Sequence, residues 1–344
     1  MTFPLLTVLA LVPIIGAIVL IFVKGQVGKL VGYGFALTTL VLGVLAFILH
    51  TQGAALAEDV SWIPAIGAHY ALDLDGMGAI LVLMTVILVP VVLLAEWHVG
   101  DHETARWSGS TFFALALLMQ GLALYVFMAS DILLFYVAFE ATLIPTYFLI
   151  VGFGGPRRRA AAIKFLIFSL AGGLVMLVAV AGVYAATAAQ GSPSFLIGDV
   201  VGLDMGTNMA RWLFVGFFFA FAVKAPLVGL HTWLPDTAEQ ATPGTSTLLV
   251  GILDKIGTFG MIKICLQAFP EATQWATPVI LIWAIVSMLY GAFMAFGAKD
   301  LLRLVSYTSI SHFGIMVFGI FALTTQSITG SIFYMLNHGL STAA

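Results

Sequence analysis

Five ionisable side chains lie deep inside long apolar stretches of this 344-residue sequence, where a charge is costly. They are Glu140, Lys224, Lys255, His312 and His338, and each lies nine to twelve residues past the nearest polar boundary of its stretch. At a rise of ~1.5 Å per residue, this spacing puts each group ~14–18 Å inside a hydrocarbon layer ~30 Å thick. A charged side chain at that depth costs at least ~2.5–3.5 kcal/mol to insert and is a functional candidate by default.

The shared depth of the five groups is more informative than any one of them. A single buried histidine such as His338 is more often a satisfied packing residue. Five groups at one depth instead predict a hydrated polar line in the membrane plane, because buried ionisable groups face bundle interiors or water and pair with one another.

The stretch FAVKAPLVGLHTWLPDTAEQ, residues 221–240, carries more helix breakers and polar groups than a bent helix needs. Pro226 and Pro235 are predicted to break this helix, with His231 between them. Because proline lacks an N–H, Pro226 is also expected to leave the carbonyl of Ala222 without its helical partner, as a place for water. Broken helices at membrane depth line cavities in transporters.

Pro145 predicts a second helix break, five residues after Glu140, and is expected to free the carbonyl of Ala141. A proline kink that only shapes the bundle is an equally good interpretation, since prolines are well tolerated in membrane helices. Both interpretations stay open at this residue.

The composition excludes a soluble domain. Hydrophobic residues make up 61% of the chain and charged residues 8%, whereas soluble domains carry about a quarter charged residues. The single cysteine, Cys265, excludes an internal disulfide and a cysteine-ligated cluster, and no ligand spacing predicts a metal site. No basic patch with interleaved aromatic residues is present, so no nucleic-acid partner is expected. The apolar run 3–23 has no basic residue ahead of it and no cleavage site, which indicates a retained helix.

Eleven apolar runs of helix length predict an all-α polytopic membrane protein. A membrane-spanning helix needs ~20 apolar residues, and the runs lack the strict alternation of barrel strands. No hydrophilic linker is long enough for an extramembrane domain, so residues 1–344 are expected to form a single integral membrane domain. The runs are 3–23, 30–50, 78–97, 110–129, 131–152, 161–188, 209–230, 245–269, 273–297, 301–323 and 327–344.

The basic residues predict the orientation of the chain. With the N-terminus outside, the inner connections hold nine lysines and arginines and the outer connections hold only Arg211. This positive-inside bias places the N-terminus outside and the basic loops in the cytoplasm. The outer acids are expected to be solvated or to cap helices, with a proton-collecting surface as the alternative. They are Glu58, Asp59, Asp73, Asp75, Asp199 and Asp204.

Four stretches resemble the antiporter-like subunits of proton-pumping NADH–quinone oxidoreductase, respiratory complex I. They are FEATLIPTYFLIVGFGGPRRRAAAIKFLIFSLAGGLVML (139–177), FAVKAPLVGLHTWLPDTAEQ (221–240), GILDK (251–255) and KDLLRLVSYTSISHFG (299–314). The first most resembles the subunit M branch of that family, the mitochondrial chain 4. The lysine-containing motifs are specific to a superfamily that also includes multisubunit sodium/proton antiporters and membrane-bound hydrogenases.

The resemblance implies an antiporter-like inverted-repeat fold and a role for each of the five groups. It implies that Glu140 is the glutamate of helix 5, Lys224 the lysine of broken helix 7 and Lys255 the lysine of helix 8. His312 and His338 are then the histidines of later helices.

The sequence also departs from the family pattern. Phe139 stands where a tryptophan is common, and the turn ATPGTS (241–246) changes the usual order; both are expected to alter only packing. Asp254 stands beside a lysine where an apolar residue is usual, and it either pairs locally or points elsewhere. Family members continue for further helices, so the sequence is expected to be truncated in helix 11. Within it, residues 1–108 are expected to contain the N-terminal helices 1–3, and residues 109–344 the antiporter-like core.

These residues predict a proton relay that is driven from outside the chain. A carboxylate beside a buried ammonium stabilises both charges, whereas burial without a partner favours the neutral forms. Separating Glu140 from Lys224 would therefore release a proton from the lysine. That proton is expected to reach Lys255 through water and His231 or His312. The resemblance implies that quinone reduction in partner subunits supplies the energy, so FMN, iron–sulfur clusters and quinone are expected there and no cofactor or redox site in this chain.

The predicted function is proton translocation as one subunit of an NADH:quinone oxidoreductase in a bacterial cell membrane. The expected partners are other membrane-arm subunits, the lipid bilayer and protons. One alternative is a subunit of a multisubunit sodium/proton antiporter or of a membrane-bound hydrogenase. Others are an autonomous secondary transporter, which would need more buried oxygen ligands, and a structural scaffold, for which several buried charges are costly. An active site for NADH or quinone is least favoured, because no glycine-rich nucleotide fingerprint is present.

Overall fold

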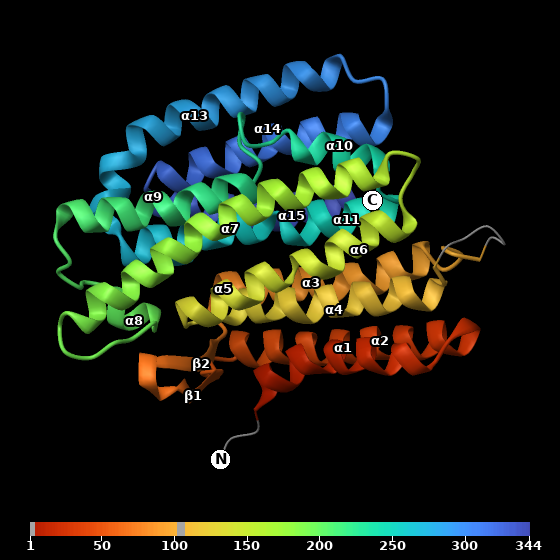
Figure 1. Ribbon diagram of the computed structural model, residues 1–344, viewed down its shortest axis with the longest axis horizontal. Helices are drawn as coiled ribbons and strands as arrows, with labels where there is room; N and C mark the ends of the chain where they lie inside the picture. The colour runs from red at the N-terminus through yellow and green to blue at the C-terminus, as the bar shows by residue number, and fades with distance from the viewer. Residues whose placement is uncertain (1–3, 102–106) are drawn as a thin grey trace.

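The computed structural model describes residues 4–101 and 107–344, which form a bundle of long helices lying side by side (Figure 1). Eight spans within those residues are long and apolar enough to cross a membrane, in agreement with the predicted polytopic class. The spans are α1 (Leu5–Phe22), α2 (Gly25–Thr51), α3 (Gly76–Ala95), α4 (Gly109–Met128), the pair α5 (Ile132–Ala141) and α6 (Leu143–Phe153), α7 (Arg158–Ala188), α13 (Pro270–Phe296) and α14 (Leu301–Phe321).

Three of the eleven predicted runs do not form uninterrupted apolar spans. The run 209–230 contains α9 (Thr207–Lys224), which ends because Ala225 leaves helical geometry just before a proline. The run 327–344 forms α15 (Thr325–Ala343), whose many polar residues lower its hydropathy. Two short helices complete this part of the chain, α8 (Ile197–Val200) before α9 and α10 (Trp233–Gln240) after it.

The run 245–269 forms a continuous rod of mixed helical type. The rod consists of α11 (Pro243–Leu248), the π-helical turn η2 (Leu249–Leu253), α12 (Lys255–Gly260) and the π-helical turn η3 (Met261–Leu266). The Thr242 hydroxyl caps its start by accepting a hydrogen bond from the Thr245 N–H. π-Helical turns are rare and often lie at functional sites, and the apolar pattern of the sequence did not predict them.

The connection between α2 and α3 contains a β-hairpin, which the all-α prediction did not include. Strand β1 (Ala57–Ile63) pairs antiparallel with β2 (Ala68–Asp73), and the short 3₁₀ turn η1 (Pro64–Ile66) joins them. Gly67 closes the turn with a φ of +67°, a left-handed conformation that favours glycine. Because β1 is exposed along almost its whole length, its sequence lacks the alternation that marks a half-buried strand.

Successive spans run in opposite directions, so the bundle has two different ends. At the first end the hairpin meets the start of α1, where Glu58 accepts a hydrogen bond of 2.7 Å from the Leu6 N–H. At the second end the Gly155 N–H donates to the Gln240 carbonyl at 2.7 Å. We call these the hairpin end and the basic end, since the second carries Arg157, Lys164 and Arg303.

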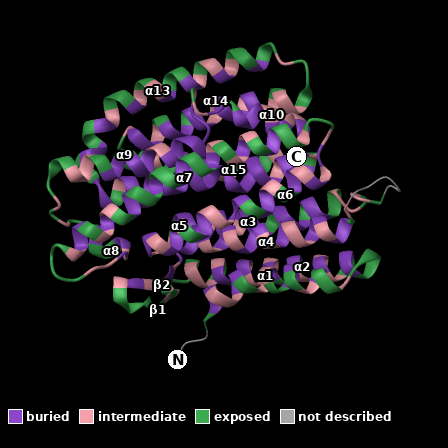
Figure 2. Ribbon diagram, in the orientation of Figure 1, coloured by how far each residue is buried: buried purple, intermediate pink, exposed green. Residues whose placement is uncertain are grey.

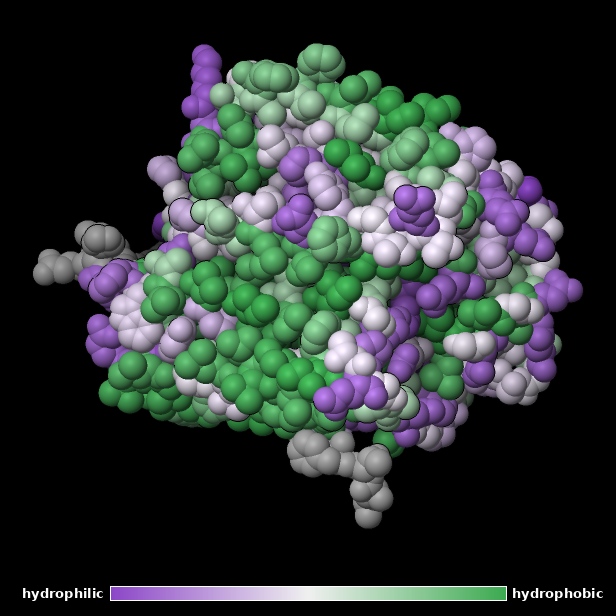
Figure 3. All heavy atoms as spheres, turned by 180° about the vertical axis from the view of Figure 1, so that it is seen from behind, coloured by the Kyte–Doolittle hydropathy of each residue, from purple (hydrophilic) through white to green (hydrophobic). Residues whose placement is uncertain are grey.

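Burial follows the position of each helix in the bundle (Figure 2). Helices α3 and α4 are mostly buried, whereas α2 and α13 expose much of their surface. The exposed side chains of the outer helices include large apolar groups such as Phe22, Val178 and Phe296, and Figure 3 shows broad apolar areas on one face of the molecule. Contiguous apolar surface of this kind is unfavourable in water and suits contact with lipid.

Candidate functional site

Lys224 is the last residue of α9 and is buried in the centre of the bundle. Its ammonium nitrogen has no hydrogen-bond partner among the residues that the structure describes. Two aromatic rings lie near it: Nζ is 5.3 Å from the centre of the Phe139 ring and 5.8 Å from that of Phe165. Ring faces attract a cation, so these two rings partly replace the polar partner that Lys224 lacks.

The break after Lys224 is confirmed, but the carbonyl expected to be free is not free. The carbonyl of Ala222 accepts a hydrogen bond of 3.1 Å from the Leu227 N–H, so the prediction of an unpaired carbonyl there was wrong. The indole Nε1–H of Trp233 donates to the Val223 carbonyl at 3.1 Å. Protein donors therefore satisfy the broken end of α9, which holds Lys224 in a defined position.

Pro235 does not break a helix, in contrast to the prediction. It lies in the first turn of α10, where the N–H groups have no helical partner and a missing donor has no consequence. The break of the chain instead lies between Lys224 and Trp233, where Gly229 adopts a φ of +95°. Of the two prolines in this stretch, only Pro226 lies in the broken segment.

Glu140 lies near the junction of α5 and α6, where Thr142 keeps right-handed helical geometry. The two helices form one span, Ile132–Phe153, so the helix break predicted at Pro145 stays a prediction. The carboxylate of Glu140 lies against Gly173 of α7, where the Cβ of any larger residue would overlap it. A glycine at this position therefore makes room for the carboxylate.

Glu140 and Lys224 lie within electrostatic range of each other but do not form an ion pair. The charge of Lys224 acts on the carboxylate, yet in the described part of the chain no ion pair, defined by an N–O distance of 4.0 Å or less, joins them. The buried Oε1 of Glu140 likewise finds no hydrogen-bond partner there. The predicted switch requires two arrangements, one with Glu140 paired to Lys224 and one with the two groups separated. The structure has the separated arrangement.

Lys255 and the two histidines of the later helices form a contiguous group. The Lys255 ammonium donates a hydrogen bond of 2.7 Å to the Val250 carbonyl, and its nitrogen lies 2.5 Å from Nδ1 of His338. The ring of His312 packs edge-on against that of His338, with 5.1 Å between ring centres. His338, which alone would be read as a packing residue, therefore contacts a buried lysine directly.

The π-helical turn η2 explains why Lys255 finds a backbone acceptor. In this turn hydrogen bonds run from residue i+5 to residue i, and the Asp254 N–H accordingly donates to the Leu249 carbonyl at 3.0 Å. The wider turn leaves the Val250 carbonyl available to the Lys255 side chain. Part of the site thus depends on local backbone geometry that an apolar sequence pattern does not encode.

The role of His231 between the two lysines stays a prediction. Its ring packs edge-on against Tyr290, with ring centres 5.0 Å apart, and its Nδ1 accepts a hydrogen bond from the Gly229 N–H. Among the described residues, no hydrogen bond or ring contact joins it to Lys224 or Lys255. The charge of Lys164, at the basic end, also acts on His231.

The basic end carries an ion-pair network that the sequence did not reveal. Lys164 pairs with Asp236 at 2.6 Å, and Arg157 and Arg303 each pair with Glu239 at 2.6 Å. A hollow of about 160 Å³ opens over part of this network, lined by Arg157, Ala160, Ala161, Lys164, Asp236, Glu239 and Gln240. In the sequence, the basic partners of these ion pairs were used only to predict the orientation of the chain. The acids Asp236 and Glu239, three residues apart in the stretch 221–240, were a pattern from which ion pairs could have been predicted.

Further ion pairs lie nearer the surface. At the hairpin end, Lys263 of η3 pairs with Asp75 at 2.5 Å, while Asp75 also caps α3 by accepting from the Gly78 N–H. At the opposite end, the Lys29 ammonium donates a hydrogen bond to Asp101 and lowers the pKa of that carboxyl below its ordinary value. The expectation that outer acids cap helices is confirmed for Asp75, and the pairing of Lys263 was not predicted.

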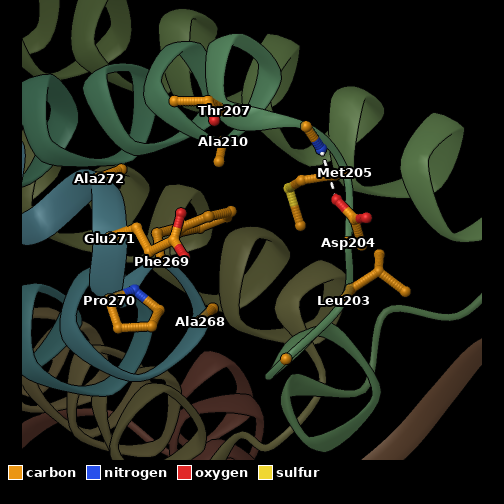
Figure 4. Close-up of a pocket in the computed structure, with 12 residues that line it drawn as sticks. Leu203, Asp204, Met205, Thr207, Ala210, Ala268, Phe269, Pro270, Glu271 and Ala272 are labelled. Carbon is orange, nitrogen blue, oxygen red and sulfur yellow. Dashed lines mark hydrogen bonds between the residues drawn. The ribbon is translucent and has the colours of Figure 1, made fainter.

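A surface pocket of about 400 Å³ lies at the hairpin end, between the starts of α9 and α13 (Figure 4). Its lining includes Asp204, Thr207, Phe269 and Glu271, and none of the predicted relay residues lines it. The Asp204 side chain accepts a hydrogen bond from the Gly206 N–H at 3.2 Å, within its own loop. Within residues 4–101 and 107–344, no group of histidine, cysteine and acidic side chains could hold a metal ion.

The sequence and the fold both match known membrane proteins. Residues 129–344 match the family described as NADH:quinone oxidoreductase/Mrp antiporter, TM. The chain is 43% identical to NADH-quinone oxidoreductase subunit M of Mycobacterium tuberculosis (strain ATCC 25618 / H37Rv), over 99% of this chain and 68% of that protein. It is 33% identical to NAD(P)H-quinone oxidoreductase chain 4 3 of Picosynechococcus sp. (strain ATCC 27264 / PCC 7002 / PR-6), over 98% of this chain and 61% of that protein.

Two solved structures have the same fold. A chain of respiratory complex I from Thermus thermophilus with bound NADH superposes with a TM-score of 0.88 at 33% identity, covering 98% of this chain and 69% of that chain. A chain of the Mrp complex from Dietzia sp. DQ12-45-1b also reaches a TM-score of 0.88, at 22% identity, covering 100% of this chain and 63% of that chain.

Proposed function

Because this chain belongs to the family of transmembrane subunits of NADH:quinone oxidoreductases and Mrp antiporters, we propose that it is a proton-translocating membrane-arm subunit of an NADH:quinone oxidoreductase. The observation that carries the proposal is the set of buried titratable groups Lys224, Lys255 and His338 inside the bundle, with the half-buried ring of His312 packed against His338. Buried ionisable groups of membrane proteins mark ion pathways and proton relays. Moving protons along such a line requires no electron carrier in the chain itself.

The ion-pair network at the basic end is the proposed entry to this line. Lys164 pairs with Asp236, and its charge acts on His231. Phe165, the next residue of α7, packs on Trp233 and lies near the Lys224 ammonium. Ionised groups on α7 and α10 thus lie close to the end of α9, which supports proton delivery to Lys224 from the basic end.

Glu140 is the proposed control of Lys224. When the carboxylate is close, it stabilises the protonated lysine, and when it is apart, the buried ammonium loses that support and gives up its proton. The structure has the two groups apart, with a buried oxygen of Glu140 and the nitrogen of Lys224 both unpartnered among the described residues. The movement that brings them together would be driven by partner subunits, which we propose contain the FMN, iron–sulfur clusters and quinone.

The proposed orientation places the basic end in the cytoplasm and the hairpin end outside, in the membrane of a bacterial cell. The excess of basic residues at one end supports this orientation. The proposed partners are other membrane-arm subunits, which is in keeping with the multisubunit assemblies named for the relatives.

A subunit of a sodium/proton antiporter is the second candidate, because the fold likeness to the Mrp complex is as high as that to complex I. Purification from the native membrane in mild detergent separates the two candidates. We expect the chain to copurify with subunits that oxidise NADH, and copurification with antiporter subunits alone would contradict the proposal.

The transport activity is tested with Lys255→Ala in inverted membrane vesicles. We expect the assembled complex on a native gel in normal amount and a loss of most NADH-driven proton uptake, since the central acceptor is gone. The same assay in sodium-free medium should give full uptake for the unmodified complex. Normal uptake by assembled Lys255→Ala would refute the relay.

A further inference from the structure

Asp254 is a fully buried carboxylate that the relay described above does not use. Its residue is completely inaccessible to solvent, and neither of its side-chain oxygens has a hydrogen-bond partner among residues 4–101 and 107–344. Burying an ionisable carboxyl without a partner is strongly unfavourable. A residue that served only to pack the rod could be apolar at lower cost. The burial of Asp254 without a partner therefore makes it a candidate functional residue.

The rod places Asp254 and Lys255 on different faces. Asp254 shares a face with Gly257, three residues later, because residues i and i+3 are neighbours on a helix surface. A Cβ at Gly257 would lie 2.6 Å from the Ala225 nitrogen and 2.7 Å from the Phe221 carbonyl oxygen. This face thus packs directly against the end of α9, on both sides of Lys224 in the sequence.

The neighbouring face, which carries Lys255, packs against another helix. Lys255 shares it with Gly251, four residues earlier, and a Cβ at Gly251 would lie 3.6 Å from the Gly339 carbonyl oxygen of α15. The contact between Lys255 and His338 lies on the same side. Consecutive residues of the rod therefore face the two halves of the proposed line, Asp254 towards Lys224 and Lys255 towards the histidines.

The charges agree with this placement. The charges of two buried cations, Lys224 and Lys255, act on Asp254. In the described part of the chain, neither lysine forms an ion pair with Asp254 within 4.0 Å. No hydrogen bond within residues 4–101 and 107–344 fixes the carboxylate to one lysine.

We propose that Asp254 is a proton-transferring carboxylate that connects Lys224 to Lys255. In the first step the Lys224 ammonium gives a proton to the Asp254 carboxylate, which leaves a neutral amine and a neutral carboxylic acid. In the second step the acid gives that proton to the neutral amine of Lys255, which restores the carboxylate and forms an ammonium. One proton has then moved from α9 to the rod, and His338 is in position to accept it next.

This inference rests on the proposed proton-translocating function and adds a residue to its route. It places Asp254, and not His231, as the group between the two lysines. The order of the groups becomes Lys224, Asp254, Lys255, His338 and His312.

The test compares Asp254→Asn and Asp254→Glu in the whole complex, with NADH-driven proton uptake by inverted vesicles measured beside the amount of assembled complex. The amide is nearly the same size as the carboxyl but cannot carry the proton, so assembled Asp254→Asn is expected to lose most proton uptake. Asp254→Glu keeps the titratable group and is expected to recover a substantial part. Asp199→Asn, the same chemical change at an exposed position of the short helix α8, is the matched control with normal uptake.

Two further variants make the result decisive. If assembled Asp254→Asn pumps normally while Lys224→Met does not, this inference is wrong and the proposed function stands. If both pump normally, the proposed function itself fails. Should Asp254→Asn not assemble, Asp254→Ser is the second neutral variant, and normal uptake by it overturns the inference. Failure of both neutral variants to assemble shows that the carboxylate is structural, which overturns it as well.

Discussion

At the scale of single residues, the site combines buried charges with very few direct partners. The Lys224 nitrogen, one oxygen of Glu140 and both side-chain oxygens of Asp254 lack hydrogen-bond partners in the described chain. An ion pair whose only role is to hold helices together needs close contact, because only close contact offsets the loss of hydration. Charges held near one another but apart are suited to changing partners, which is what a relay requires.

The first prediction concerns Glu140. The amide of Glu140→Gln is nearly isosteric, and the Lys224 amine can lose its proton, so we expect normal assembly and a collapse of NADH-driven proton uptake. Glu140→Asp keeps the charge but retracts it by one methylene, and it should recover a substantial part of the activity. Both are measured as proton uptake in vesicles beside assembled complex on a native gel.

A purely structural role for Glu140 makes a different prediction. Removing one partner of a truly buried ion pair destabilises a protein by ~3–5 kcal/mol, so assembly would be lost together with activity. Assembled Glu140→Gln with normal pumping would show that this carboxylate does not control the lysine.

At the scale of elements, two interrupted helices meet in the centre of the bundle. α9 ends at Lys224, and the rod contains π-helical turns on either side of α12. Their close approach depends on Gly257, where a Cβ would lie 2.6 Å from the Ala225 nitrogen and 2.7 Å from the Phe221 carbonyl oxygen. The interruption of one helix and the widening of the other are what bring Lys224, Asp254 and Lys255 into one region.

The second prediction tests this approach. A Cβ in Gly257→Ala would meet backbone atoms of Ala225 and Phe221, which cannot rotate away as a side chain can. We expect a destabilisation of about 1–3 kcal/mol from overpacking, seen as a lower temperature of half-loss of assembled complex in detergent. Gly34→Ala, where nothing lies within 4 Å of the new Cβ, is the control and should not lower that temperature. Equal thermal stability of the two variants would contradict the close contact.

At the scale of the whole molecule, the bundle has a basic end and a hairpin end, and the face drawn in Figure 3 carries broad apolar areas. The spans alternate in direction between the two ends. The orientation of the molecule in its membrane therefore follows from locating a single loop.

The third prediction locates that loop. Pro156 is exposed at the basic end, and Pro156→Cys should react with a membrane-impermeant thiol reagent in inverted vesicles and not in intact cells. Ser192→Cys, exposed at the hairpin end, should show the opposite pattern. The native Cys265 is buried and should contribute little background. Labelling of Pro156→Cys from outside intact cells would reverse every assignment of sides.

The fourth prediction concerns the pocket at the hairpin end (Figure 4). Asp204→Asn should leave proton uptake nearly unchanged, because an exposed acid in water is screened from a buried relay. Loss of most uptake would instead show that the acids of this end collect or release protons. The measurement is the same vesicle assay, with Asp199→Asn beside it.

The sequence by itself determined the membrane class, the family and the identity of most buried charges. Apolar runs identify spans because hydrocarbon admits little else, and depth along a run follows from the constant rise of a helix. For the same reason Glu140, Lys224 and Lys255 could be found without coordinates. The exposed hairpin and the π-helical turns could not be predicted. The hairpin residues are polar and apolar in no regular order, like those of the loop around them, and the π-helical turns are as apolar as the rest of their helix.

Only the tertiary structure decided which groups meet. Contacts between residues far apart in the chain depend on the angles and approach of helices, which no single run of residues encodes. So His338 contacts Lys255, His231 packs against Tyr290, and Pro235 lies in the first turn of a helix that it was predicted to break. The sequence showed that Asp254 lies beside Lys255 at a position where the family usually has an apolar residue. Its burial beside α9, with no hydrogen bond from the described residues, became visible only when the helices were packed.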